Sequence, residues 1–213
     1  MKILEKALLA GLILSMVFSM MGFSYICNNI ENKVLRLHVL ANSDSAEDQD
    51  LKLKVRDKVL EYSGDIFSLA NTKDEAEKIT SEKIDEIRNV ALEEIHNLGY
   101  DYDVKVELTN MYFNTRHYEN VTLPAGRYDA LRIIIGSGKG KNWWCVMFPS
   151  MCIPAATEEQ KDLSKVLNEE EIDLVENEEK YEVKFKCIEA FEYMKDYLEN
   201  LQDEINDKYA IEI

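Results

Sequence analysis

The pattern of hydrophobic and polar residues predicts a strand followed by two helices in the first half of the chain. Residues 34–40 are rich in branched apolar side chains that partly alternate with polar ones, which is typical of a strand packed on one face. Apolar residues recur every fourth position over residues 46–62, so they share one face of a helix. A capping-box sequence opens a second helix over residues 72–98, and Gly99 can end it.

Four later segments are predicted to be strands. Residues 102–108 alternate strictly between apolar or aromatic and charged side chains, and further extended runs cover residues 112–118, 128–135 and 143–148. Because the connections between them are short, these strands are expected to pair antiparallel. The sequence therefore predicts an α+β fold, with a mostly antiparallel sheet of about five strands, two N-terminal helices on one face and a C-terminal helix.

The N-terminal residues 1–27 have the features of an export segment. Lys2 and Lys6 precede residues 7–27, which contain no charged side chain. A basic start before an apolar run is the secretory pattern and places the rest of the chain outside the cytoplasm. The run exceeds the usual signal core and approaches the ~20 residues that span a bilayer. Residues 1–27 are thus either a cleaved signal peptide or a single membrane anchor.

The remaining chain divides into three predicted parts. Residues 28–156 form one α+β domain, residues 157–180 an acidic connector, and residues 181–213 an amphipathic helix in which Cys187 is expected to be buried. This helix carries a narrow apolar stripe, spaced 3, 4, 3, 4, which consists of Phe191, Met194, Leu198, Leu201 and Ile205. We expect the stripe to dock on the helix's own domain, because a coiled-coil seam needs more than two heptads.

Composition narrows the classes of function. The chain has 25 basic and 41 acidic residues, a formal net charge of -16, which argues against a general nucleic-acid binder. The charge is locally basic in the middle of the chain, because residues 110–156 hold five basic and two acidic residues among many aromatic ones. Exposed tryptophan beside arginine is the usual composition of a protein-recognition hot spot. The candidate partner-binding residues are Arg116, Arg132, Lys139, Lys141, Trp143 and Trp144.

Two features of this middle region concern orientation and redox state. Trp143 and Trp144 are adjacent on one predicted strand, so they cannot both point inward, and at least one is expected on the opposite face. Cys145 and Cys152 are close in sequence, and nearby cysteines of an exported protein usually oxidise to a disulfide. The alternatives are two buried free thiols, or a Cys145 nucleophile paired with a histidine.

No cofactor or metal site is predicted. The glycine-rich residues 136–142 lack the spacing of a phosphate-binding loop and lie between two strands, so a flexible hairpin with two exposed lysines is expected. The cysteines and histidines do not have the spacing of zinc ligands, and the acidic residues 42–50 lack the glycine and terminal glutamate of a calcium loop.

Several segments of the sequence resemble one known family. The similarity runs in order through residues 33–153, and the segment around Asn142-Trp143-Trp144-Cys145 is its most specific part. The chain resembles the stage II sporulation protein R family. Its motifs include His38, Asn42 and Asp44, and the matching segments are residues 35–45, 51–57, 123–132 and 138–149, followed by Cys152.

The resemblance implies a signalling protein and no enzyme. Such a protein is made in the forespore and exported into the space between the two membranes. There it activates a membrane-embedded aspartic protease of the mother cell, which processes the sigma-E precursor. The resemblance implies no catalytic residues, no cofactor and no nucleic-acid partner, and membrane contact only through residues 7–27 if they are not cleaved. The competing hypothesis is an exported enzyme acting on cell wall or lipid through Cys145.

Overall fold

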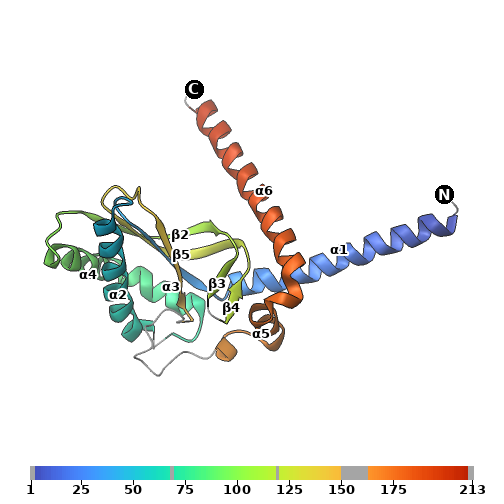
Figure 1. The fold of residues 1–213 in the computed structure, drawn as a ribbon, viewed down its shortest axis with the longest axis horizontal. Helices are drawn as coiled ribbons and strands as arrows, with labels where there is room; N and C mark the ends of the chain where they lie inside the picture. The colour runs from blue at the N-terminus through green and yellow to red at the C-terminus, as the bar shows by residue number, and fades with distance from the viewer. Residues whose placement is uncertain (1–2, 68–69, 119, 150–162, 211–213) are drawn as a thin grey trace. The chain divides into compact units, whose positions relative to one another are not determined.

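A computed structural model describes residues 3–67, 70–118, 120–149 and 163–210. Its ribbon is drawn in Figure 1. The chain divides into two compact units. The first, called here the sheet unit, comprises residues 32–111 and 128–168, and the second, the helical unit, comprises residues 1–31, 112–127 and 169–213.

The sheet has four strands in the order β2-β5-β1-β6. β1 (Leu35–Leu40) runs parallel to β5 (Gly126–Ile135) and antiparallel to β6 (Asn142–Phe148). β2 (Val104–Phe113) runs opposite to β5, because contacts join Asp103 to Gly136 and Asn110 to Asp129. The predicted α+β class is confirmed, although the sheet is mixed.

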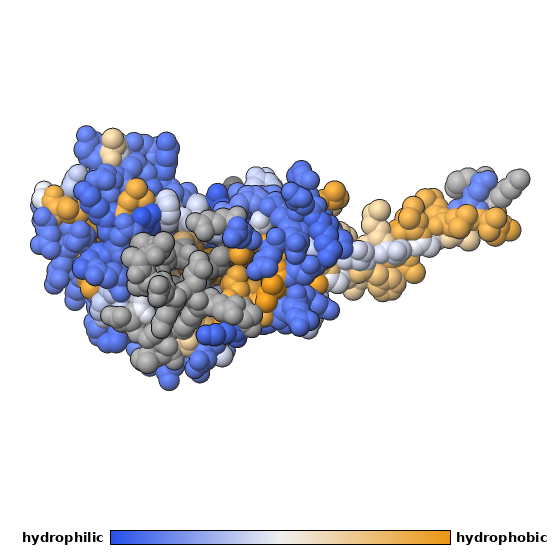
Figure 2. All heavy atoms as spheres, turned by 60° about the horizontal axis from the view of Figure 1, so that its bottom comes forward, coloured by the Kyte–Doolittle hydropathy of each residue, from blue (hydrophilic) through white to orange (hydrophobic). Residues whose placement is uncertain are grey.

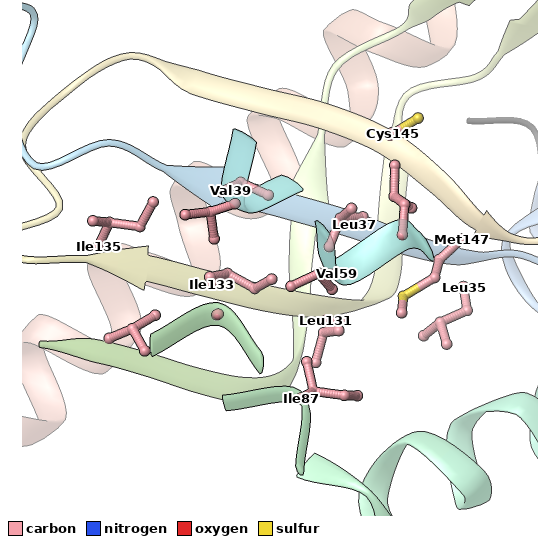
Figure 3. Packing of buried hydrophobic residues seen from close by; sticks show 14 of the residues in the cluster. Leu35, Leu37, Val39, Val59, Ile87, Leu131, Ile133, Ile135, Cys145 and Met147 are labelled. Carbon is pink, nitrogen blue, oxygen red and sulfur yellow. The ribbon is translucent and has the colours of Figure 1, made fainter. Parts of the chain in front are cut away.

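Three helices supply the apolar residues that pack on one face of this sheet. They are α2 (Ala46–Phe67), α3 (Lys73–Glu82) and α4 (Ile84–Asn97). Alternate residues of β1, β5 and β6 point toward them, as Figure 3 shows. Burial of this apolar surface is the main stabilising contribution in the unit. The core includes Leu35, Leu37, Val39, Val55, Val59, Ile87, Ala91, Ile95, Leu131, Ile133 and Ile135.

Two predicted elements are interrupted in the structure. The helix expected over residues 72–98 is two helices, because the chain leaves helical geometry at Lys83 (φ -107, ψ 10). The predicted cap at its start is present, with the Thr72 hydroxyl accepting a hydrogen bond from the Glu75 amide. The strand expected over residues 112–118 is also divided, since β2 ends at Phe113 and a separate strand β3 covers Arg116–Tyr118.

In its described residues the helical unit contains three helices and a small sheet. They are α1 (Ile3–Glu31), α5 (Glu169–Glu176) and α6 (Glu178–Ala210), with β3 paired antiparallel to β4 (Val121–Leu123). α1 is the one described helix long and apolar enough to cross a membrane. Its apolar side chains form the orange run at the right of Figure 2.

The C-terminal part differs from the expectation. The short helix η1 (Leu163–Lys165), α5 and the start of α6 lie where an acidic connector was predicted, and residues 157–162 of that connector are outside the described residues. The prediction that the apolar stripe of the last helix packs on its own domain was wrong for Phe191, Met194 and Leu198. Their side chains are 52%, 54% and 56% exposed. Cys187, expected to be buried, is exposed. The division into four parts stays a prediction.

A candidate partner-binding surface at the end of the sheet

The connection between β5 and β6 crosses the end of β1. β5 and β6 flank β1 on either side, so residues 136–141 pass over the point where β1 ends. Backbone amides of this loop bind the segment that follows β1: Gly140 donates to the Ala41 carbonyl (2.9 Å) and Lys141 to the Asp44 carboxylate (2.7 Å). The loop expected to be a flexible hairpin is therefore held along its length.

Asn42 is the central residue of this attachment. Its side-chain oxygen accepts a hydrogen bond from the Ser137 amide (2.9 Å), and its backbone carbonyl accepts one from the Ser137 hydroxyl (2.7 Å). Its side-chain nitrogen donates to the Asp48 carboxylate (2.9 Å). One amide side chain thus joins the β1–α2 segment, the first turn of α2 and the β5–β6 loop.

Glycine is required where the two segments touch. A Cβ atom on Gly140 would lie 2.2 Å from the Ser43 carbonyl oxygen, and one on Gly136 would lie 2.5 Å from the Asn42 side-chain oxygen. Gly136 also has φ +55, a left-handed conformation that L side chains rarely adopt. The glycines that suggested flexibility instead permit close approach of the loop to the Ser43 backbone and to the Asn42 side chain.

Asp48 is a buried carboxylate at the start of α2. Burial alone would raise its pKa, but hydrogen bonds from Ser43, Asn42 and Tyr102 outweigh this effect and hold the pKa below its usual value. The ionised carboxylate also lies in the first turn of a helix, where negative charge is favourable. Asp48 therefore provides a stable acceptor for the segment after β1.

His38 lies in a row of side chains across the sheet, on the face opposite to the helices. The strand registers place it between Arg132 on β5 and Trp144 on β6, and Arg132 contacts Glu107 on β2 (3.3 Å). His38 is 2% exposed, and its Nε2 lies 2.8 Å from the side-chain oxygen of Asn142. An amide oxygen only accepts, so Nε2 carries the hydrogen.

His38 is neutral at physiological pH. Burial lowers its pKa to about 4, the positive charge of Arg132 acts in the same direction, and the hydrogen bond to Asn142 opposes them. Within the described residues its Nδ1 has no hydrogen-bond partner, so a second hydrogen there would be buried without an acceptor. The histidine orients Asn142 and supports Trp144 without carrying charge.

Trp143 and Trp144 lie on opposite faces of β6, as the strand period predicted. Trp144 stacks on His38, with ring centroids 3.9 Å apart. Trp143 pairs with Val39 on the helix side and is 36% exposed. The guanidinium of Arg56 on α2 lies over its indole, 4.3 Å from the ring centroid. Trp143 is therefore an exposed aromatic side chain held from one side by a cation.

We call Arg56, Lys139, Lys141 and Trp143 the tryptophan edge. Lys139 and Lys141 are exposed on the β5–β6 loop next to Trp143. The Lys141 carbonyl accepts a hydrogen bond from the buried Lys52 ammonium on α2 (2.9 Å), which adds a further attachment. Arg56 was not predicted as a site residue, since nothing in the sequence indicated which helix residue would meet the tryptophan.

Two other candidates lie elsewhere. Arg132 is on the opposite sheet face from Trp143, in the row with His38. Arg116 is on β3 of the helical unit, opposite Leu123. The structure therefore brings together three of the six predicted partner-binding residues: Lys139, Lys141 and Trp143. Trp144 follows Trp143 on β6 but lies on the opposite face of the sheet.

His38 is not the histidine partner that a Cys145 nucleophile would need. Cys145 is 4% exposed and belongs to the core on the helix side, whereas His38 points to the other face. His117, in the helical unit, contacts Thr122 and Glu178.

Cys152 lies outside the described residues, so the disulfide between Cys145 and Cys152 stays a prediction. Among the described residues no group of three histidines, cysteines or carboxylates could hold a metal ion.

Comparisons with known proteins agree on one family. A family model described as stage II sporulation protein R matches residues 31–159, which include the tryptophan edge. Stage II sporulation protein R of Bacillus subtilis (strain 168) is 35% identical over 184 residues, which cover 75% of this chain and 80% of that protein. No solved structure matches. The chain belongs to the stage II sporulation protein R family.

Proposed function

We propose that this sporulation signalling protein is the exported ligand that activates a membrane-embedded aspartic protease of the mother cell, and thereby starts processing of the sigma-E precursor. Family membership supports the role in sporulation signalling. A ligand of this kind needs no catalytic residues. It needs a surface that binds the active state of its receptor more tightly than the inactive one.

The observation that carries the proposal is the fixed position of Trp143. Its backbone continues from a loop that Asn42 and Asp44 attach to the β1–α2 segment, and Arg56 covers one side of its ring. A side chain already held in place loses little conformational freedom on binding, so more of its contact energy appears as affinity. Tryptophan and arginine are also the residues most enriched in hot spots.

The energies required are within reach of such a surface. A nearly complete switch of a two-state receptor needs about 5.5 kcal/mol of differential binding. Single hot-spot residues contribute about 2 kcal/mol or more. About three hot-spot contacts would therefore suffice, and the tryptophan edge offers Trp143, Arg56 and the two loop lysines as candidates. The lysines also suit an acidic receptor segment.

We further propose that the chain stays attached to the membrane it crosses, by retaining α1. The first part of α1 is exposed, with Leu8, Phe18 and Met21 between 62% and 66% exposed. From Ile3 to Gly22 the helix measures about 30 Å, the thickness of a bilayer's hydrocarbon core. This part has the length and composition of a membrane span.

The last turns of α1 belong to the core of the helical unit. Phe23, Cys27 and Ile30 are 3%, 1% and 0% exposed. The Phe23 ring packs edge-to-face on Phe185 (centroids 5.5 Å apart) and against Tyr181 (6.0 Å), both on α6. Cleavage at residue 27 would remove Phe23 and Cys27 and expose their partners. This favours a retained anchor over a cleaved signal peptide.

Reconstitution in a non-sporulating bacterium tests the signalling proposal. The host carries the sigma-E precursor and the protease, with or without this chain, and precursor cleavage is followed by immunoblot. We expect cleavage only when the chain is present. No cleavage, with the protease and the exported chain both detected, would contradict the proposal that this chain is sufficient to activate the protease.

A further inference from the structure

α6 has two faces with different surroundings. One face is packed within the helical unit: Phe185, Ile188 and Glu192 are 3%, 4% and 7% exposed. Arg127 pairs with Asp196 on the same side. Since a helix turns 100° per residue, the centre of this packed face can be located from these positions. α6 is thereby held to its own unit along its first half.

The other face is apolar and exposed. Its centre lies roughly 130° from the packed face by helical geometry. The side chains on it include Val183 (75% exposed), Phe191 (52%), Met194 (54%) and Leu198 (56%). Cys187, an exposed free thiol, lies in the same stripe, between Val183 and Phe191. A run of exposed apolar side chains of this length marks an interaction site.

The spacing of this stripe is that of a coiled-coil seam. From Cys187 the apolar positions follow at intervals of 4, 3 and 4 residues, and the sequence continues the pattern at Leu201 and Ile205. The alternation of 3 and 4 places these residues at heptad positions d and a in turn, which pack against equivalent positions of a partner helix. From Cys187 to Ile205 the pattern is longer than two heptads, whereas Val183, four residues before Cys187, falls at position g beside the seam.

The charges of α6 are distributed as pairing with an identical helix requires. The positions that flank the seam between Cys187 and Leu201 are Ile188, Ala190, Lys195 and Tyr197, among which there is one charge. The acidic residues of this stretch lie at the outer positions b and f: Glu189, Glu192, Asp196 and Glu199. Two copies of the acidic helix can therefore meet along the seam without like charges facing each other.

We propose that α6 pairs with α6 of a second copy of this chain, in parallel, through the seam formed by Cys187, Phe191, Met194 and Leu198. The parallel direction rests on the proposed anchoring, because two copies held by α1 in one membrane have the same orientation. In a parallel pair each seam residue lies opposite the same residue of the second copy. Apolar side chains can pack against one another in this way.

Cys187 provides the test. Among the described residues the free cysteines are Cys187, which is exposed, and Cys27, which is 1% exposed. In a parallel pair the two Cys187 thiols face each other across the seam, within reach of a short bismaleimide that joins thiols without oxidation. The full chain in detergent micelles is treated with this reagent, and its mass is measured independently by sedimentation.

The expected result is a cross-linked dimer and a dimeric mass. Leu198→Glu places a charge in the seam and should weaken dimerisation at least tenfold, without unfolding the chain because Leu198 is exposed. Tyr193→Glu is the matched control, because Tyr193 is 63% exposed but lies outside the seam, and it should leave the dimer unchanged. Unchanged circular dichroism shows that both variants are folded.

Three results would contradict the proposal. A monomeric mass at all concentrations would mean that the seam does not bind a second copy and is free for another protein. A dimer that Leu198→Glu does not weaken would place the contact elsewhere, for example between α1 helices. A seam-dependent dimer without a Cys187 cross-link would exclude the parallel direction. Because the readout is mass, failure here is distinguishable from failure of the signalling proposal.

Discussion

The imidazole of His38 lies flat against the indole of Trp144, with ring centroids 3.9 Å apart and planes inclined by 7°. The same imidazole contacts Asn142, two residues earlier on β6. His38 therefore supports β6 next to Trp143, the residue we expect to meet the receptor. This histidine of the family motifs is therefore a neutral supporting residue.

His38 should make the folded state sensitive to mild acid. Its pKa is about 4 in the folded state and about 6.5 when unfolded, so the unfolded chain binds the proton first as the pH falls. Its contribution to stability is complete above pH 6.5 and falls by about 3 kcal/mol as the pH decreases to 4. Urea unfolding at pH 7 and pH 4.5 measures this loss.

His38→Phe is the matching variant, because phenylalanine keeps a stacked ring that cannot be protonated. It should be less stable than the wild type at pH 7, since Asn142 loses its donor, but it should lose less stability between pH 7 and pH 4.5. An equal loss in both proteins would show that His38 does not contribute to the acid sensitivity.

The sequence predicted the fold class and the opposite orientation of the two tryptophans, because both follow from local periodicity. It also indicated His38, Asn42 and Asp44 as motif residues but not what they do. Each of these side chains contacts residues 136–142, about a hundred positions later, and such pairings depend on the order of strands in the sheet. A mixed sheet, with β1 between β5 and β6, was not evident from short connections.

The unpredicted features have similar causes. Arg56 meets Trp143 through the packing of α2 on the sheet, which no local pattern specifies. The prediction that the apolar stripe of α6 docks on its own domain was wrong for Phe191, Met194 and Leu198, because α6 packs through Phe185 and Ile188 and leaves the stripe exposed. Burial of Cys187 was wrong for the same reason. Periodicity locates the apolar face of a helix, whereas its partner is set by tertiary structure.

Gly140→Ala should displace the β5–β6 loop. The added Cβ would lie 2.2 Å from the Ser43 carbonyl, so the loop must move away from the segment after β1 and lose hydrogen bonds there, each contributing about 1 kcal/mol. The sequence contains two tryptophans, both at this site, so tryptophan emission reports the change directly. We expect a shift in emission and reduced precursor cleavage.

Gly99→Ala is the control for this variant. A Cβ on Gly99 meets no atom within 4 Å, although its φ of +85 makes the substitution mildly strained. It should lower stability slightly and leave tryptophan emission unchanged. If Gly140→Ala also leaves the emission and cleavage unchanged, the loop attachment does not position the tryptophans.

Phe23→Ala should destabilise the helical unit by about 3 to 5 kcal/mol, the usual cost of removing a buried phenylalanine. Phe18→Ala, in the exposed part of the same helix, should change its stability little in detergent. Urea unfolding in micelles compares them, and mass spectrometry of the membrane fraction should find the N-terminal segment still attached. Equal stability of the two variants, or a mature chain lacking residues 1–27, would contradict retention of α1.

The central claim is that Trp143 is the hot spot through which the chain activates its receptor. The most direct measurement is precursor cleavage in the reconstituted host with Trp143→Ala, compared with Tyr193→Ala, which removes a more exposed aromatic ring from α6. Loss of about 2 kcal/mol of binding corresponds to roughly a 30-fold loss of affinity. We expect cleavage to fall at least tenfold with Trp143→Ala and to persist with Tyr193→Ala. Undiminished cleavage by a folded, exported Trp143→Ala chain would contradict the claim.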